Sequence, residues 1–452
     1  MRPRRQRFLT GSVMRHIVVM TLTGSLGISF MFVVDMATLF WVSYLGVEQY
    51  VAAMGYAFVI QFFTISAGIG FMIAATAMVS KSIGQGNFEQ ARQQTTNAAI
   101  LSFASQLAVA IVVIVFRYEI LALAGAEGET MDVAARFLVI SVPSLPFMAL
   151  GMIASGVLRA EGDAARAMLG TLSAGLIAMV VDPLFIIGFD MGMDGAALGM
   201  VISRSLSACL ALWFVIRVHD LAARPELGSI LRYAKPFFLF SLPAVATQMA
   251  SPFGNAVMTR VMAEHGDAAV AGLTVVVRLG VLTFGGIFAL SGAIGGIIGQ
   301  NYGAGRMDRV KAAYRDALVF CFAYTMVAWG LLALTSELMV SAFRLSGDAA
   351  VVLRAFTHIA AFGYSFTGFV FVANAAFNNL GRPVYSTLSN WLRDGVLMYP
   401  ACLMFGTWYA AQGVLYGQMA ASIVSGLFAM VWGWRYVSRL EYSARTQAAT
   451  SS

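Results

Sequence analysis

The chain has 452 residues, of which 59% are hydrophobic and 11% are charged, compared with about 25% charged residues in a soluble domain. Its mean hydropathy is +0.78 and its net charge is +7. This composition excludes a disordered chain, a nucleic-acid-binding domain and a secreted disulfide scaffold, and it indicates a polytopic membrane protein. The three cysteines, Cys209, Cys321 and Cys402, all lie in apolar stretches, which excludes a disulfide or metal framework.

Apolar runs separated by polar, glycine or proline residues predict an all-α membrane protein with twelve transmembrane helices. Their lengths favour helices over the shorter, alternating strands of a membrane barrel. In chain order, the predicted spans are residues 17–45, 51–80, 95–116, 133–158, 168–189, 195–217, 236–263, 268–298, 313–336, 351–378, 388–408 and 411–434.

Charge predicts the orientation of these helices. The start at residues 1–7 resembles the basic region of a signal peptide, but the apolar run after it is too long and lacks a small-residue cleavage site. We therefore expect a retained first helix. With both termini in the cytoplasm, 22 of the 29 lysines and arginines lie at inner ends and five lie at outer ends. This asymmetry is a strong positive-inside signal and predicts a multi-pass inner-membrane protein.

The two halves of the chain resemble each other at a shift near 219 residues. Residues 83–92 align with residues 302–311, and Gly162 aligns with Gly381. A shift of six helices predicts two parallel repeats related by a pseudo-two-fold axis along the membrane normal, which is typical of transporters. We expect an N-lobe at 1–220, with helices 1–6 and the cation-coupling site, and a C-lobe at 221–452, with helices 7–12.

Of the 22 acidic residues, Asp35 and Asp182 are the two predicted to lie well inside a span, both in its outer half. A carboxylate that faces lipid is costly, so both are expected to face protein or water. If they are close, they titrate as a pair that can hold a proton and release it when a cation binds. The alternative interpretation is a fixed hydrogen bond to a serine or threonine, or to an arginine such as Arg204.

Other polar residues within the spans predict a substrate cavity or, equally, hydrogen bonds between helices. These candidates are Gln61, Thr64, Gln248, Asn255, Arg278, Asn374 and Asn378. Helix hinges are expected at Gly24, Gly27 and Pro183. Arg393 and Asp394 are interpreted as an ion pair at the inner surface. Phosphate-loop, zinc-protease and nucleophile–base patterns are absent from the sequence, so we expect no enzyme activity and no fixed metal.

Several segments, taken in chain order, resemble the motifs of one protein family. They are Asp35 with the run 40–46, Val-Asp-Pro-Leu-Phe-Ile-Ile-Gly at 181–188, Ile-Ile-Gly-Gln-Asn-Tyr-Gly-Ala-Gly-Arg at 297–306, and Asn-Asn-Leu-Gly-Arg-Pro at 378–383. The chain resembles the multidrug and toxic compound extrusion (MATE) family over residues 15–436. Its two intramembrane aspartates resemble the DNA-damage-inducible protein F-like branch, although Ala178 stands where that branch usually has asparagine.

This resemblance implies a secondary antiporter that exports organic, often cationic compounds in exchange for protons or sodium. It also implies that Asp35 and Asp182 carry the coupling ion, with sodium as the alternative to a proton, and that no other cofactor is needed. We expect the protein to bind a small organic substrate, to lie in a lipid bilayer and to bind no nucleic acid. We also expect it to be a monomer. The alternatives are a lipid-linked oligosaccharide flippase, which would favour a cationic cavity, and a channel-like membrane protein.

Overall fold

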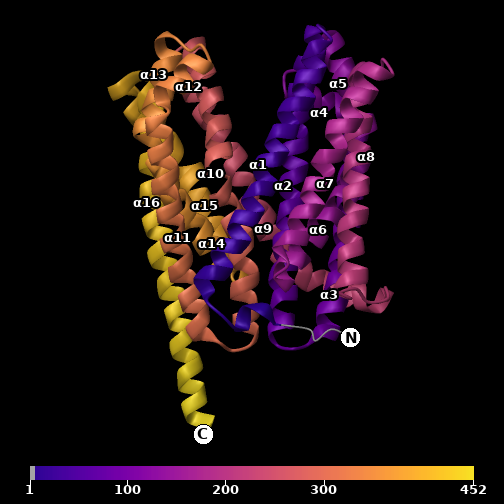
Figure 1. Ribbon diagram of the computed structural model, residues 1–452, viewed down its shortest axis with the longest axis vertical. Coiled ribbons are helices and arrows are strands. Elements are labelled where there is room, and N and C mark those ends of the chain that lie inside the picture. The colour runs from indigo at the N-terminus through magenta and orange to yellow at the C-terminus, as the bar shows by residue number, and fades with distance from the viewer. Residues whose placement is uncertain (1–5, 452) are drawn as a thin grey trace. The chain divides into compact units, whose positions relative to one another are not determined.

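The computed structural model describes residues 6–451, and these residues are almost entirely helical (Figure 1). The basic residues 2, 4 and 5, which contribute to the predicted inner charge, lie outside the described part of the chain. In the first half the helices are η1 (Arg7–Leu9), α1 (Val13–Tyr44), α2 (Glu48–Gly84), α3 (Phe88–Val115), α4 (Arg117–Leu123), α5 (Gly128–Ser141), η2 (Val142–Ser144), α6 (Leu145–Glu161), α7 (Ala164–Pro183), η3 (Leu184–Gly188), α8 (Gly192–Trp213) and η4 (Phe214–Val218).

The second half repeats this pattern of long helices. It contains α9 (Leu227–Ala263), α10 (Asp267–Gly303), α11 (Met307–Leu334), α12 (Ser336–Ala342), α13 (Gly347–His358), η5 (Ala360–Gly363), α14 (Tyr364–Asn379), α15 (Pro383–Trp391), η6 (Leu392–Leu397) and α16 (Met398–Ser451). The segments η3, η4 and η6 are π-helical. In a π-helix the backbone hydrogen bonds join residues five positions apart, whereas in an α-helix they join residues four positions apart.

The helices agree with the twelve predicted spans. Within residues 6–451, ten segments are long and apolar enough to cross a membrane by length and composition. The helix α9 provides another span, and α16 is two helices joined at Ala410, where φ 55° and ψ −143° break the helical backbone. The prediction of a twelve-helix all-α membrane protein is confirmed.

Several helices begin earlier than their apolar runs predict. The helix α3 begins at Phe88 and α15 begins at Pro383, several residues before the predicted spans. Polar residues cap and extend the first turns. At α3, for example, the Asn87 side chain accepts a hydrogen bond from the backbone N–H of Gln90. Hydropathy locates the apolar part of a helix and misses such polar ends.

The chain forms two compact units that differ from the predicted lobe boundaries. Unit 1 comprises the chain up to Ser25, residues 84–86 and residues 246–452; unit 2 comprises residues 26–83 and 87–245. The start of α1 therefore belongs with the second repeat, and the start of α9 belongs with the first.

Close packing explains this exchange of helix ends. In unit 1, a Cβ on Gly24 of α1 would lie 3.2 Å from the Cβ of Ala289 on α10. In unit 2, Phe237 of α9 is fully buried and stacks on Phe71 of α2, with ring centroids 6.0 Å apart. A sequence boundary placed in the basic linker cannot anticipate such contacts.

Small residues allow the helices of each unit to approach closely. In unit 2, a Cβ on Gly156 of α6 would lie 2.6 Å from the hydroxyl of Thr76 on α2. In unit 1, a Cβ on Gly426 of α16 would lie 2.5 Å from the carbonyl oxygen of Phe366 on α14. Such small-residue contacts are the usual means of packing helices in a membrane, and they hold the polar side chains described next in fixed positions.

Candidate cation-coupling site

Asp182 lies in the last turn of α7 in unit 2, and only 3% of the residue is exposed. The Thr38 hydroxyl of α1 lies 2.5 Å from Asp182 Oδ2 and 3.1 Å from the Val34 carbonyl oxygen, so its one proton is shared between two acceptors. Within the described chain, Asp182 Oδ1 has no hydrogen-bond partner. An ionised carboxylate with a bare buried oxygen is costly, and a proton, a cation or a water molecule bound at this atom would remove that cost.

A glycine on α8 makes room for this carboxylate. A Cβ on Gly199 would lie 2.2 Å from Asp182 Oδ1, a distance at which the two atoms would clash. Pro183 follows the aspartate directly, and the backbone then continues as the π-helical segment η3. Since π-helical turns within α-helices are often found at functional sites, this local geometry agrees with a functional role for Asp182.

Asp35 lies on α1, one turn before Thr38, and therefore on the same face of the helix. It is exposed, unlike Asp182. It interacts electrostatically with Arg204 of α8 and with Asp182. The structure thus brings the two aspartates, which are 147 positions apart in sequence, into one site within unit 2.

Arg204 is held beside Asp35 by two side chains from other helices. Its Nη1 donates to Ser144 Oγ at 3.1 Å, and its Nη2 donates to Gln61 Oε1 at 2.9 Å. The Gln61 Nε2 atom also lies 3.4 Å from Ser141 Oγ. The guanidinium is thereby fixed in position, and it adds a positive charge to a site that otherwise contains two acids.

The two predicted cavity residues in this half are both buried. Gln61 positions Arg204, whereas the hydroxyl of Thr64 donates to the Gln61 carbonyl oxygen at 2.8 Å. The Thr64 carbonyl oxygen accepts a hydrogen bond from Gln106 at 2.9 Å. These contacts assign Gln61 to the charged site and Thr64 to packing between α2 and α3.

The predicted cavity residues of the second half lie on three helices of unit 1. Gln248 and Asn255 lie on α9, half-buried and exposed respectively, and Arg278 is exposed on α10. Asn374 and Asn378 are buried on α14, where the Ser386 hydroxyl lies 3.1 Å from the Asn374 carbonyl oxygen and 2.9 Å from Asn378 Oδ1. The Asn378 side chain thus faces α15, whereas Asn374 contacts that helix through its backbone carbonyl.

The interpretation of Arg393 and Asp394 as a surface pair is wrong. They lie in η6, ten and eleven residues after the start of α15, and they are 5% and 2% exposed. Two hydrogen bonds of 2.8 Å join Arg393 Nε and Nη2 to the Asp394 carboxylate. Gly254 of α9 makes room for this pair, because a Cβ there would lie 3.0 Å from the Asp394 Cβ. Asp394 is therefore a buried acid in the second half of the chain, although the prediction assigned this pair to the inner surface.

Two of the predicted hinge residues, Gly24 and Gly27, lie within the continuous helix α1, and the third, Pro183, lies at the end of α7. The division between the two units crosses α1 between Gly24 and Gly27. A Cβ on Gly27 would lie 3.6 Å from Met168 Cγ of α7, an ordinary contact distance. Pro183 marks the change from α7 to η3.

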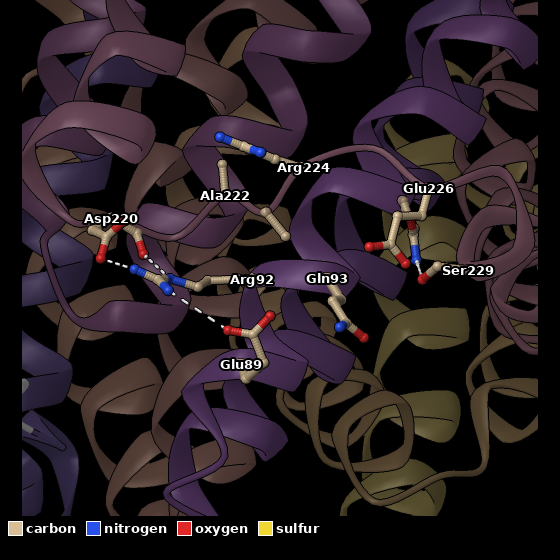
Figure 2. Close-up of a pocket in the computed structure, with 10 residues that line it drawn as sticks. Glu89, Arg92, Gln93, Asp220, Ala222, Arg224, Glu226 and Ser229 are labelled. Atoms are coloured by element: carbon tan, nitrogen blue, oxygen red, sulfur yellow. Dashed lines mark hydrogen bonds and ion pairs between the residues drawn. The ribbon is translucent and has the colours of Figure 1, made fainter.

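A separate pocket of about 350 Å³ lies between α3 and the linker that follows η4 (Figure 2). Its lining residues are Glu89, Arg92, Gln93, Asn97, Asp220, Ala222, Ala223, Arg224, Glu226 and Ser229. In Figure 2 the Arg92 guanidinium lies between the carboxylates of Glu89 and Asp220, with which it forms ion pairs. This pocket contains none of the predicted site residues.

Twelve membrane-length helices in two repeats, with ionisable groups buried among them, define a polytopic membrane transporter. Comparison with known proteins identifies its family. The MatE family matches residues 25–184 and again residues 243–404, once in each repeat and together over more than half of the chain. The chain belongs to the MatE family of transporters, and members of this family are transporters rather than enzymes.

The relatives agree with this assignment. The chain is 24% identical to a FAD transporter of Shewanella oneidensis, over 94% of this chain and 95% of that protein. It is 25% identical to the multidrug export protein MepA of Staphylococcus aureus strain MRSA252, over 82% of each chain. A crystal structure of MATE in the straight conformation matches with a TM-score of 0.89 at 21% identity, covering 97% of this chain and 99% of that one. The protein is therefore a membrane efflux transporter of small compounds.

Proposed function

We propose that this protein is a secondary antiporter that exports organic, mainly cationic compounds across the inner membrane in exchange for protons or sodium ions. The observation that carries the proposal is the Asp182 carboxylate, with one oxygen bound by Thr38 and the other buried without a partner in the described chain. Asp35 and Arg204 complete the charged site. The two aspartates also support assignment to the DNA-damage-inducible protein F-like branch of the family.

The geometry supports exchange at Asp182. In one state a proton or a sodium ion occupies Oδ1 and neutralises the buried charge. The oxygen-bearing side chains of this site are Asp182, Thr38 and Asp35, and hard cations prefer such oxygen ligands. An organic cation that approaches the exposed Asp35 competes for the same negative charge. The coupling ion is released, and a shift between inward- and outward-open states carries the substrate across.

The orientation and the cellular setting follow from the charge distribution. We propose that both termini are cytoplasmic, because most lysines and arginines lie at the ends of the helices on that side. We also propose that the protein acts as a monomer, since one chain carries both repeats. The two acids in the unit 2 site favour this export function over a lipid-linked oligosaccharide flippase, for which a cationic cavity is expected.

Flux measurements with the purified protein in liposomes test the proposal. A pH gradient and, separately, a sodium gradient are imposed, with an ethidium-like cation as the substrate. We expect Asp35→Asn and Asp182→Asn each to abolish gradient-driven flux, because neither amide carries the charge that binds the coupling ion. The gradient that drives flux in the unmodified protein identifies the ion.

Asp348→Asn is the matched control, because Asp348 is an exposed acid at the start of α13, remote in sequence from the site residues. It should retain full flux. Size-exclusion profiles and thermal unfolding of all three variants establish that they are folded. Normal coupled flux in both Asp35→Asn and Asp182→Asn would refute the assigned roles. Flux that never saturates and needs no gradient would instead indicate a channel.

A further inference from the structure

The segment Gln6–Ser12, called here the N-terminal strap, is anchored by one buried aromatic side chain. Phe8 is 1% exposed, although it precedes the first long helix and lies only two residues into the described chain. Its ring packs edge-on against His16 of α1 with centroids 5.4 Å apart. An almost completely buried phenylalanine outside the long helices indicates a specific binding place for this segment.

Three polar side chains of α10 and α11 form that binding place. The Phe8 backbone N–H donates to Gln300 Oε1, and Asn301 Nδ2 donates to the Phe8 carbonyl oxygen, both at 3.2 Å. Arg309 Nη2 lies 2.9 Å from the Phe8 carbonyl oxygen and 3.0 Å from that of Gly11. Gln300 and Asn301 are completely buried, so their amides serve the strap and the α10 backbone rather than solvent.

The strap also binds the turn between α2 and α3, which comprises residues 84–86. Gln6 Nε2 donates to the Gly84 carbonyl oxygen at 3.1 Å. Gly84 itself lies so close to α10 that a Cβ there would be 2.0 Å from the Gln300 carbonyl oxygen. In the repeated motif, Gly84 and Gly303 end α2 and α10, and Gly86 and Gly305 lie in the turns that follow. The strap therefore links the end of α2 to α10.

The second repeat is preceded by an equivalent segment, which is fastened to α3. Arg92 Nε donates to the Asp220 carbonyl oxygen at 2.7 Å, and the Thr96 hydroxyl exchanges hydrogen bonds with the backbone N–H and carbonyl of Ala223. Asn97 donates to the Ser229 hydroxyl at 2.9 Å, next to the pocket in Figure 2. The helices α3 and α11 correspond under the repeat shift. The two segments are therefore held in the same way. Arg309 of α11 binds carbonyl groups of the segment before the first repeat, and Arg92 of α3 binds a carbonyl group of the segment before the second repeat.

We propose that the N-terminal strap is a releasable latch of the cytoplasmic gate. It holds the α2–α3 turn against α10 and α11 while the cytoplasmic ends are closed, and it leaves its binding place when the transporter opens inward. Release of the strap requires one aromatic side chain and a few hydrogen bonds to move, and it unfolds no long helix. This inference rests on the proposed cytoplasmic position of the termini and on the alternating access of the proposed function.

Distance measurements between spin labels test the latch directly. Labels are placed on the exposed residues at Glu89→Cys in the first repeat and Arg306→Cys in the second, with Cys209→Ser to remove the exposed native thiol. Pulsed electron spin resonance then gives the distance distribution in detergent or nanodiscs, without substrate or gradient. We expect Phe8→Ala and Arg309→Gln each to increase the long-distance population several-fold.

Arg315→Gln is the matched control, because Arg315 is an exposed arginine two turns along α11 that pairs with its neighbour Asp316. It should leave the distribution unchanged. Unchanged distributions in both Phe8→Ala and Arg309→Gln would overturn the proposal, and so would an equal change in Arg315→Gln. Should Phe8→Ala fail to fold, Phe8→Leu and Arg309→Gln carry the test. This experiment measures distances between labels and no flux. Its outcome therefore does not depend on whether Asp35 and Asp182 couple ions.

Discussion

At the scale of single residues, the charged site depends on side chains that each make a specific contact. Thr38 binds one oxygen of Asp182, Gly199 leaves space for the other, and Gln61 and Ser144 hold Arg204. The predicted alternatives for an intramembrane acid were ion exchange and a fixed hydrogen bond. The structure contains the hydrogen bond and still leaves Asp182 Oδ1 without a described partner, so the two interpretations are compatible.

Gly199→Ala is predicted to abolish ion coupling without unfolding the protein. Alanine is favoured over glycine within a helix by about 1 kcal/mol, so the substitution should not weaken α8 itself. Its Cβ, however, would lie 2.2 Å from Asp182 Oδ1 and force the carboxylate out of its position. Gradient-driven flux in liposomes and thermal unfolding measure the two effects.

The control is Gly330→Ala, because nothing lies within 4 Å of a Cβ at that position of α11. It should leave both flux and unfolding temperature close to those of the unmodified protein. Full coupled flux in Gly199→Ala would show that the close approach of Gly199 to Asp182 has no functional importance.

At the scale of elements, the start of α7 is organised by a buried acid outside the membrane-spanning segments. Asp163 Oδ1 accepts a hydrogen bond from the backbone N–H of Arg166 at 3.1 Å and so caps α7. His219, just after η4, lies 3.1 Å from Asp163 Oδ2, which also pairs with the Arg166 guanidinium. Burial alone would raise the pKa of Asp163, but the hydrogen bonds from His219 and Arg166 hold that pKa well below its ordinary value.

Asp163→Asn is predicted to destabilise the protein at neutral pH by about 1.5–3 kcal/mol, the usual contribution of hydrogen bonds to a charged group. Asparagine remains a good helix cap, so the change removes the charge and keeps the cap. Because the pKa is lowered in the folded state, the charge stabilises the protein above the ordinary aspartate pKa of about 3.9 and loses this effect as the pH falls below it.

Thermal unfolding in detergent at a series of pH values checks this prediction. The difference between the unmodified protein and Asp163→Asn should be constant from about pH 8 to pH 5 and should shrink only below about pH 4. A difference that already vanishes between pH 8 and pH 6 would contradict the assigned role of the carboxylate. Asp132→Asn, at an acid near the start of α5, serves as the control.

The helices also show which features hydropathy predicts and which it does not. The apolar cores of the twelve helices were predictable, because a membrane span requires a long apolar run. The polar first turns were not, since they depend on caps such as Asn87 and Asp163. Arg393 was assigned to the inner surface together with the other basic residues. In the structure Arg393 and Asp394 pair within η6, where neither charge faces lipid.

At the scale of the whole molecule, the two repeats are recognisable in the sequence, in the family match and in the order of the helices. The compact units exchange helix ends between the repeats, which a linear boundary at residue 220 does not describe. Within unit 1, the beginning of α1 and the end of α16 lie at the end of the helices opposite to α12 and α13 (Figure 1). This placement agrees with an even number of spans between the termini.

Cysteine labelling is predicted to show that this end faces the cytoplasm. In a Cys209→Ser background, Arg306→Cys should react with a membrane-impermeant maleimide in inside-out vesicles and not in intact cells. Asp348→Cys should show the reverse, because it lies at the start of α13. Both positions are exposed, so labelling depends on the side of the membrane. The opposite pattern would refute the cytoplasmic position of the termini.

The sequence by itself determined the membrane class, the twelve spans, the repeat and the pair of aspartates, because each is recorded in local composition or in periodic spacing. Tertiary structure alone decided which groups meet these aspartates, how α1 and α9 are divided between the units, and where the N-terminal strap binds. The central contacts in these features join residues far apart in the sequence, such as Thr38 with Asp182 and Phe8 with Gln300. Such contacts follow from the packing of complete helices and leave no periodic signal in one sequence.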